Sequence, residues 1–128
     1  MDDIAIMATL TDLIIAGTDT TSAMLSWFVA YQCKYPEEQE KLHKEYLNHE
    51  IPPTKLDSES TPYLDAFIKE TFRLRPAAPL SLPHVTDQEV EVAGYTIPKD
   101  TMIFPNLWGA MRDPTIWKDG EEFRYIIN

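Results

Sequence analysis

A hydroxyl-rich run with one glycine and one carboxylate, Ala16-Gly17-Thr18-Asp19-Thr20-Thr21, stands out in the first third of this sequence. Gly17 carries no side chain, so a flat ligand can approach the backbone there, and Asp19 places a carboxylate close by. The hydroxyl of Thr20 can bond back to the carbonyl of Ala16, which bends a helix or opens a groove in it. A hydroxyl, a carboxylate and space for water suit the delivery of protons to a bound molecule.

The same residues also fit a plain structural role. In a buried helix, threonine hydroxyls satisfy carbonyl groups of their own backbone, and a glycine lets a neighbouring helix pack closely. Most apolar helices that resemble this one belong to protein cores, without any site. The residues alone therefore leave both interpretations open.

A long helix must carry this run. The segment from Ile4 to Tyr35 holds no proline and only one glycine, and its apolar residues recur at helical spacing. It predicts one helix from Ile4 to about Lys34, on the order of 45 Å long. The five weak helix formers from Gly17 to Thr21 cost a few kcal/mol relative to alanine. We therefore expect the helix to be bent or widened at Gly17–Thr20.

The rest of the chain predicts two more helices and a small β meander. A first helix covers 1–35, a second 36–48 and a third 61–75, while strands occupy 85–104 and a further segment 105–128. Prolines begin the second and third helices, and Thr61 is expected to cap the third. The fold class is mainly α with a small β meander.

The third helix carries an apolar stripe that we expect to pack against the long helix. Its members are Leu64, Phe67, Ile68, Thr71 and Phe72. Glu70 and Arg73 fall on the opposite side, three residues apart. From helix geometry alone such a pair is a surface ion pair worth a few tenths of a kcal/mol.

Composition excludes several classes of protein. The 128 residues suffice for one domain, and a net charge of −10 without a basic stripe excludes a nucleic-acid partner. The single cysteine, Cys33, excludes an internal disulfide and a multi-cysteine zinc site. Asp12 and Asp19 cut the uncharged run far below the roughly 18 residues of a membrane span. Asp2 and Asp3 stand where a signal peptide would be positively charged.

Several motifs now resemble one family in their order and spacing. They are Ala16-Gly17-Thr18-Asp19-Thr20-Thr21, Glu70-Thr71-Phe72-Arg73, Gly94-Tyr95-Thr96-Ile97-Pro98-Lys99, Asn106-Leu107-Trp108 and Arg112-Asp113-Pro114. Together they resemble the cytochrome P-450 haem-thiolate monooxygenases, and the resemblance covers nearly the whole chain. Leu82-Pro83-His84 looks most like the animal microsomal members. The resemblance implies a fragment of that fold, with helices I, J and K and adjoining β-sheet strands.

The resemblance also implies roles for single residues on the long helix. Thr20 matches the threonine that hydrogen-bonds dioxygen on the haem iron, and Asp19 matches its acidic partner in proton delivery. Ala16 and Gly17 would flank the oxygen-binding groove, with Ala16 also near the substrate.

Further roles fall outside that helix. Leu82 would face the substrate, and His84 matches a position that contacts a haem propionate. Glu70 and Arg73 match the structural pair of helix K, so the resemblance implies a buried pair within a network.

The cofactor implied is haem, iron protoporphyrin IX. The reaction implied is reductive activation of dioxygen, protonation, O–O cleavage pushed by a cysteine thiolate, and insertion of one oxygen atom into a small apolar organic substrate. An NADPH reductase as redox partner and the endoplasmic reticulum membrane as location follow from the family alone.

The sequence also departs from the family pattern. Glu122-Phe123-Arg124 matches the beginning of the family's Phe-Arg-Pro-Glu-Arg-Phe stretch, but Tyr125-Ile126-Ile127-Asn128 follows, with Ile127 where the network arginine would stand. The glycine-rich loop with the axial cysteine and the membrane anchor are absent from these 128 residues, so no metal ligand is assigned. We expect a fragment of a monooxygenase, inactive by itself. The alternative is a truncated, non-enzymatic product that acts as an interaction module or is degraded.

Overall fold

The computed structural model describes residues 2–48 and 59–124. Two compact units divide the chain, one formed by Met1–Ala77 with Glu121–Asn128 and the other by Ala78–Gly120. The first unit holds the long helices, and the second holds short strands and one helical turn. The predicted fold class, mainly helical with a small amount of antiparallel β structure, is confirmed.

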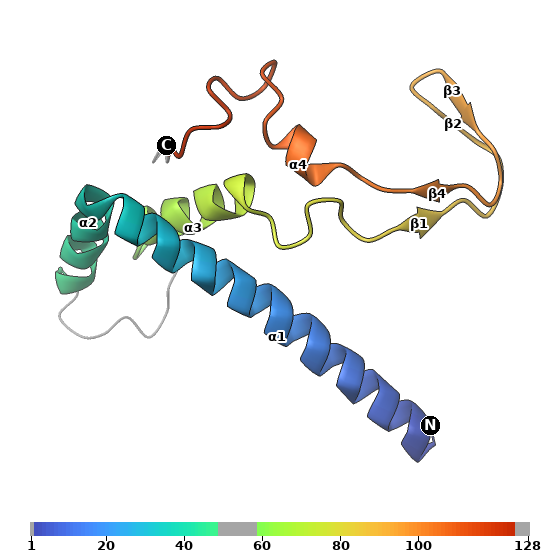
Figure 1. Cartoon of the computed structure of the whole chain (residues 1–128), viewed down its shortest axis with the longest axis horizontal. Coiled ribbons are helices and arrows are strands. Elements are labelled where there is room, and N and C mark those ends of the chain that lie inside the picture. Colours follow the sequence, from blue (N-terminus) through green and yellow to red (C-terminus); the bar gives the residue numbers. More distant parts are fainter. Residues whose placement is uncertain (1, 49–58, 125–128) are drawn as a thin grey trace. The chain divides into compact units, whose positions relative to one another are not determined.

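The long helix, α1 (Asp3–Lys34), runs for 32 residues without interruption (Figure 1). Asp2 caps it by accepting a hydrogen bond from the Ala5 N–H at 2.8 Å. The expected back-bond is present, because the Thr20 hydroxyl donates to the Ala16 carbonyl at 2.7 Å. The expected widening is wrong, since the backbone stays α-helical from Gly17 to Thr20. When a threonine hydroxyl donates to a carbonyl of its own helix, that carbonyl accepts two hydrogen bonds. The main-chain hydrogen bonds of the helix stay in place.

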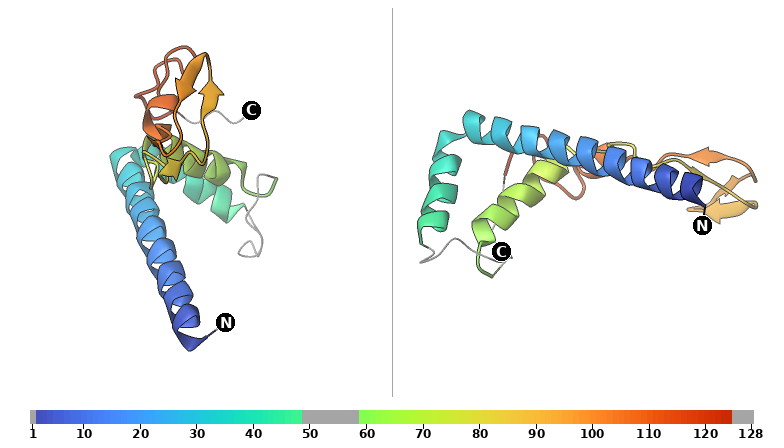
Figure 2. Two further views of the ribbon diagram at one scale, coloured as in Figure 1. Left: turned by 90° about the vertical axis from the view of Figure 1, so that its right-hand side faces the viewer. Right: turned by 90° about the horizontal axis from the view of Figure 1, so that it is seen from below.

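Two shorter helices pack beside the C-terminal part of α1. The chain turns sharply at Tyr35 into α2 (Pro36–Leu47), and α3 (Pro62–Leu74) lies against both other helices (Figures 1 and 2). Both begin with proline as predicted, but the Thr61 side chain makes no capping hydrogen bond. Residues 49–58, between α2 and α3, lie outside the described residues.

Aromatic rings form the core of this first unit. Tyr31, Phe67 and Leu74 are buried, and partly buried Phe28, Tyr35, Leu42 and Phe123 pack against them. Phe28 meets Phe67 edge-on with ring centroids 5.0 Å apart, a favoured aromatic geometry. The core therefore ties the last third of α1 to α3 and to the segment around Phe123.

The N-terminal half of α1 stays exposed. Most of its large apolar side chains, including Met7, Leu13 and Ile14, are more than half accessible to solvent. Among the described helices, α1 is long enough and apolar enough to cross a bilayer. Core helices of soluble proteins also meet these two criteria. Asp12 and Asp19 lie on nearly one face of it, where burial in hydrocarbon is costly.

The second unit is built from two short antiparallel ladders. Strands β1 (His84–Val85) and β4 (Met102–Ile103) form one ladder, and β2 (Val90–Val92) and β3 (Tyr95–Ile97) form the other (Figure 1). The predicted meander is therefore wrong in its pairing, because the last strand pairs with β1 instead of β3. One helical turn, α4 (Leu107–Ala110), follows and is capped by Asn106.

Local backbone geometry explains this pairing. Ala93 and Gly94 both adopt positive φ, of 51° and 83°, the two-residue turn that closes a tight hairpin between β2 and β3. Thr86 then holds the returning chain: its N–H donates to Thr101 O at 3.1 Å, and its carbonyl accepts from Asp100 N at 2.8 Å. These bonds bring β4 alongside β1.

Candidate functional site

The run around Thr20 forms an open strip on α1. Ala16, Gly17, Asp19 and Thr20 are all exposed. A Cβ added at Gly17 would meet no atom within 4 Å, so the helix surface offers free approach there. Ala16 and Thr20 lie one turn apart and share a face, whereas Asp19 is rotated by about 100° from Thr20.

An apolar groove of about 440 Å³ begins at this strip. Side chains of α1 and α3 line it, among them Met24, Phe28, Leu64, Ile68 and Phe72. Thr20 and Thr21 supply hydroxyl groups at the α1 wall, and Thr71 supplies one from α3. A groove of this size with few polar groups has the character of a small-molecule site.

The buried face of α3 differs from the stripe that the sequence predicts. Phe67 and Thr71 are fully buried, but Ile68 and Phe72 are exposed by 38% and 48% and line the groove instead. Glu70 and Arg73, placed by helix geometry on the outer side, are buried. The reason is the segment Glu122–Arg124, which covers that side of α3.

Glu70 and Arg73 form a two-pronged ion pair. Arg73 Nε donates to Glu70 Oε2 at 2.7 Å and Arg73 Nη2 donates to Glu70 Oε1 at 2.8 Å, with both side chains only 7% exposed. Parallel bonds of this kind between charged groups are short and directional. Helix spacing alone indicated a surface ion pair, and this interpretation is wrong because the pair is buried. Ile127, the position of the expected network arginine, lies outside the described residues.

Leu82 and His84 belong to the second unit. Leu82 is exposed just before β1, and His84 lies on β1, opposite Ile103 of β4, with its side chain also exposed. The candidate residues thus separate into two groups. Ala16, Gly17, Asp19 and Thr20 share one helix with the groove, and Leu82 and His84 share one strand region.

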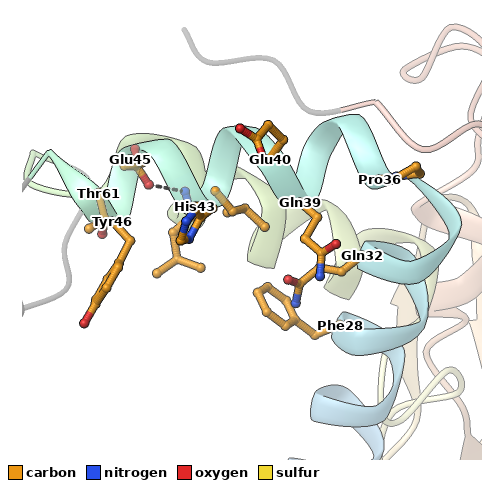
Figure 3. A pocket seen from close by; sticks show the side chains of 11 residues that line it. Phe28, Gln32, Pro36, Gln39, Glu40, His43, Glu45, Tyr46 and Thr61 are labelled. Carbon is orange, nitrogen blue, oxygen red and sulfur yellow. Dashed lines mark hydrogen bonds between the residues drawn. The ribbon is translucent and has the colours of Figure 1, made fainter.

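A second hollow, of about 530 Å³, lies at the bend between α1 and α2. Figure 3 shows Phe28 and Gln32 of α1 on one side of it and His43, Glu45 and Tyr46 of α2 on the other. The Glu45 carboxylate accepts hydrogen bonds from Tyr63 N at 2.7 Å and Leu64 N at 2.9 Å. It thereby caps α3 from another helix, a contact that sequence reasoning missed because no local signal announces it.

Metal-binding side chains do not gather in the part of the chain that is described. No group of three His, Cys, Asp or Glu residues suited to an ion occurs there. Cys33 lies exposed in the last turn of α1. It is thirteen residues from Thr20, roughly 20 Å along the helix.

Comparison with known proteins decides the family. Residues 1–125 match the family model described as Cytochrome P450. The chain belongs to the cytochrome P450 family. The α1 strip and the Glu70–Arg73 pair therefore lie in a cytochrome P450 fold, the family that the sequence motifs resemble.

Curated cytochromes P450 from animals and plants resemble this chain over most of its length. It is 44% identical to human cytochrome P450 2U1 over 115 residues, which cover 88% of this chain and 21% of that protein. It is 40% identical to a flavonoid 3',5'-hydroxylase of Crocosmia x crocosmiiflora, over 95% of this chain and 24% of that protein. The chain thus spans about a fifth to a quarter of the length of these relatives.

A solved structure agrees with the fold. A zebrafish cytochrome P450 determined with progesterone superposes with a TM-score of 0.81 at 34% sequence identity. The match covers 88% of this chain and 28% of that one. Cytochromes P450 bind haem, so haem is the cofactor of this family.

Proposed function

We propose that this chain forms the oxygen-activating wall of a haem-dependent monooxygenase, with Thr20 and Asp19 delivering protons. The observation that carries the proposal is the position of the Thr20 hydroxyl at the wall of an apolar groove, one turn from Ala16. A hydroxyl group donates one hydrogen bond and accepts through two lone pairs. Thr20 is therefore suited to accept a hydrogen bond from water and, when its O–H turns away from the Ala16 carbonyl, to donate one to a bound molecule.

Asp19 complements this hydroxyl. Its carboxylate is exposed on the same turn of α1 as Thr20 but outside the lining of the groove, so water can reach both side chains. A carboxylate next to a hydroxyl in contact with water is a common arrangement for a proton relay. In this proposal Asp19 exchanges protons with solvent, and Thr20 holds them at the reacting position.

The residues of α1 fit a flat cofactor on this side. Gly17 leaves space where any larger side chain would project, and Ala16 adds only a methyl group. In the proposal Ala16 and Gly17 border the haem face. The resemblance to the family separately assigns His84 to a haem propionate, and its imidazole is exposed. Bound haem would supply the activation of dioxygen for transfer of one oxygen atom to a substrate C–H bond.

The groove indicates the class of substrate. Its walls are mainly aliphatic and aromatic, with three threonine hydroxyls as polar groups. We propose a small apolar organic substrate that contacts Ala16, with Leu82 as a further contact. A reductase that draws electrons from NADPH and a location at the endoplasmic reticulum membrane belong to the same proposal, by analogy with the animal relatives.

A chimera tests the proposal directly. Residues 1–124 of this chain would replace the matching segment of human cytochrome P450 2U1, which is 44% identical to it. We expect the chimera to bind haem and to oxidise a substrate of that relative. Thr20→Ala should lower the yield of product per NADPH consumed by roughly tenfold or more, with peroxide formed instead.

Two matched variants serve as controls. Thr20→Ser keeps the hydroxyl and should keep the coupling of NADPH use to product. Thr9→Ala removes another α1 hydroxyl that bonds back to Ala5 at 2.9 Å, outside the groove, and should also leave coupling unchanged. If Thr20→Ala and Thr9→Ala couple NADPH use to product formation equally well, Thr20 has no role in proton delivery.

A further inference from the structure

Three oxidisable rings follow one another at the C-terminal end of α1. Trp27 and Tyr31 lie one turn apart with their ring centroids 6.2 Å from each other. Tyr31 in turn stacks on Tyr35, the residue after the helix, with ring centroids 6.2 Å apart and 15° between the planes. Indole and phenol rings give up one electron more readily than most side chains do. Because electron transfer slows steeply with distance, rings this close exchange an electron rapidly.

The series begins on the face of α1 that carries Thr20. Seven residues separate Thr20 from Trp27, which amounts to about 20° of rotation and roughly 10 Å of rise along the helix. Trp27 is 42% exposed, Tyr31 is buried and Tyr35 is half-buried. The three rings therefore lead away from Thr20 along one helix, with a buried ring in the middle.

The charges beside the rings favour loss of an electron from the tyrosines over its loss from Trp27. The Arg75 guanidinium lies over the Trp27 ring, 4.8 Å from its centroid. A cation is attracted by the electrons of an aromatic face, so it opposes the positive charge of an oxidised indole. An oxidised tyrosine instead releases its phenolic proton and becomes neutral. The Lys34 ammonium, 5.2 Å from the Tyr35 centroid, therefore does not oppose oxidation there.

A small hollow gives the phenol groups a route for their protons. Trp27, Tyr31 and Tyr35 all line this hollow of about 160 Å³, together with Lys34 and Arg75. A phenolic O–H both donates and accepts hydrogen bonds, so it exchanges its proton with water that enters. Each tyrosine can thus lose an electron and a proton together.

We propose that Trp27, Tyr31 and Tyr35 form a relay that carries a one-electron oxidising equivalent from the Thr20 face to the surface. The oxidant takes one electron from Trp27, Trp27 regains it from Tyr31, and Tyr31 regains it from Tyr35. Each tyrosine releases its phenolic proton to water when oxidised and takes one back when reduced. A water-soluble reductant of the ascorbate class then returns one electron to Tyr35. The supply of an oxidant at Thr20 rests on the proposed function, whereas the relay itself does not.

The test places a one-electron oxidant at the start of the relay. In the complete chain with Cys33→Ser, Thr20→Cys provides a single thiol for a ruthenium polypyridyl label. Light and methyl viologen, a soluble electron acceptor, convert the label to its oxidised form. We expect transient absorption to show a short-lived tryptophan radical followed by a tyrosyl radical.

Trp27→Phe in the labelled chain keeps an aromatic ring in place and should remove most of the tyrosyl signal. Equal tyrosyl yields with and without Trp27, or no tyrosyl radical in either chain, would overturn the proposal. Tyr31→Phe should let the tryptophan radical persist, because its electron donor is lost. Tyr46→Phe, which changes an exposed tyrosine of α2 outside the series, is the matched control and should leave both signals unchanged. An effect of Tyr46→Phe as large as that of Tyr31→Phe would contradict the relay.

Two further variants test the charge and the exit of the relay. Arg75→Gln removes the cation from the Trp27 ring and should lengthen the lifetime of the tryptophan radical. Added ascorbate should shorten the lifetime of the tyrosyl radical, and Tyr35→Phe should weaken this effect. Insensitivity of the tyrosyl lifetime to Tyr35→Phe would mean that the electron enters elsewhere, against the proposed order.

The outcomes for the relay and for the proposed function are separate. The labelled chain contains no haem, so a missing tyrosyl signal rejects the relay and leaves the coupling assay of Thr20→Ala in force. Unchanged coupling in that assay rejects proton delivery by Thr20, while a tyrosyl radical that depends on Trp27 would still support the relay.

Discussion

The Glu45 carboxylate on α2 accepts a hydrogen bond from the main-chain N–H of Tyr63, 2.7 Å away in the first turn of α3. Its second oxygen accepts from the N–H of Leu64 at 2.9 Å. The first N–H groups of a helix have no partner inside the helix, and Thr61 does not provide one. Glu45 therefore holds the N-terminus of the helix that carries Glu70 and Arg73.

Glu45→Ala should lower the free energy of unfolding by about 1–3 kcal/mol, because two helix N–H groups lose a charged acceptor. Urea unfolding followed by circular dichroism measures the change. Glu40→Ala is the matched control, since Glu40 on the same helix forms a solvent-exposed ion pair with Lys44, at 3.5 Å. Equal losses in the two variants would show that the contact with α3 adds nothing.

The Tyr63 hydroxyl gives a pH-dependent prediction. Burial raises the pKa of Tyr63 well above its usual value, and the hydrogen bond to Glu38 and the charges of Glu38 and Glu45 raise it further. The folded chain then holds this proton more tightly than the unfolded chain does. The stabilisation is complete below the unfolded pKa of about 10 and is lost as the pH rises above it.

Stability of the unaltered chain should therefore fall above about pH 10, by up to about 1.4 kcal/mol per pH unit for this group. Tyr63→Phe removes the group and should flatten that part of the curve. Urea unfolding at a series of alkaline pH values compares the two. Parallel curves for both chains would mean that Tyr63 does not titrate differently on folding.

Removing one partner of the buried Glu70–Arg73 pair should lower the free energy of unfolding. Glu70→Ala leaves the Arg73 guanidinium buried without its carboxylate, and we expect a loss of about 3–5 kcal/mol of unfolding free energy. Replacing both residues, Glu70→Leu with Arg73→Met, should cost less than the single change. Asp65→Ala breaks the exposed Lys69–Asp65 pair on the same helix and should cost less than about 1 kcal/mol. Denaturant unfolding of the variants ranks these costs.

The positions of the helices could be predicted from the sequence, because the residues that begin and end each helix lie within or next to it. Pro36 and Pro62 fix two helix starts, and the proline-free run from Ile4 predicts α1 to within one residue at its start. The Thr20 back-bond was likewise predictable, since it joins residues four apart in one helix. The motifs along the chain also gave the family, which the comparisons then established.

Contacts between distant segments were not predictable in the same way. Glu45 looked like one of several solvated carboxylates, and only the placement of α3 beside α2 gives it two donors. The sequence places Ile68 and Phe72 on the buried face of α3 and Glu70 and Arg73 on the exposed one, because nothing local shows that the segment Glu122–Arg124 covers the latter pair. The pairing of β4 with β1 depends likewise on Thr86, fifteen residues from Thr101.

The last prediction concerns haem in the isolated chain of 128 residues. A thiolate-ligated haem needs a cysteine on the face of the porphyrin opposite Thr20. Cys33, the one cysteine of the sequence, lies on the same helix as Thr20 and roughly 20 Å along it. We therefore expect no thiolate-ligated haem and no monooxygenase activity from this chain alone. The difference spectrum of the reduced sample with carbon monoxide, recorded after haem is added, measures this directly. Cys33→Ser should give the same spectrum as the unaltered chain. A Soret band at the position of thiolate ligation that disappears in Cys33→Ser would show that Cys33 reaches the iron, and the placement of haem against Thr20 would then be wrong.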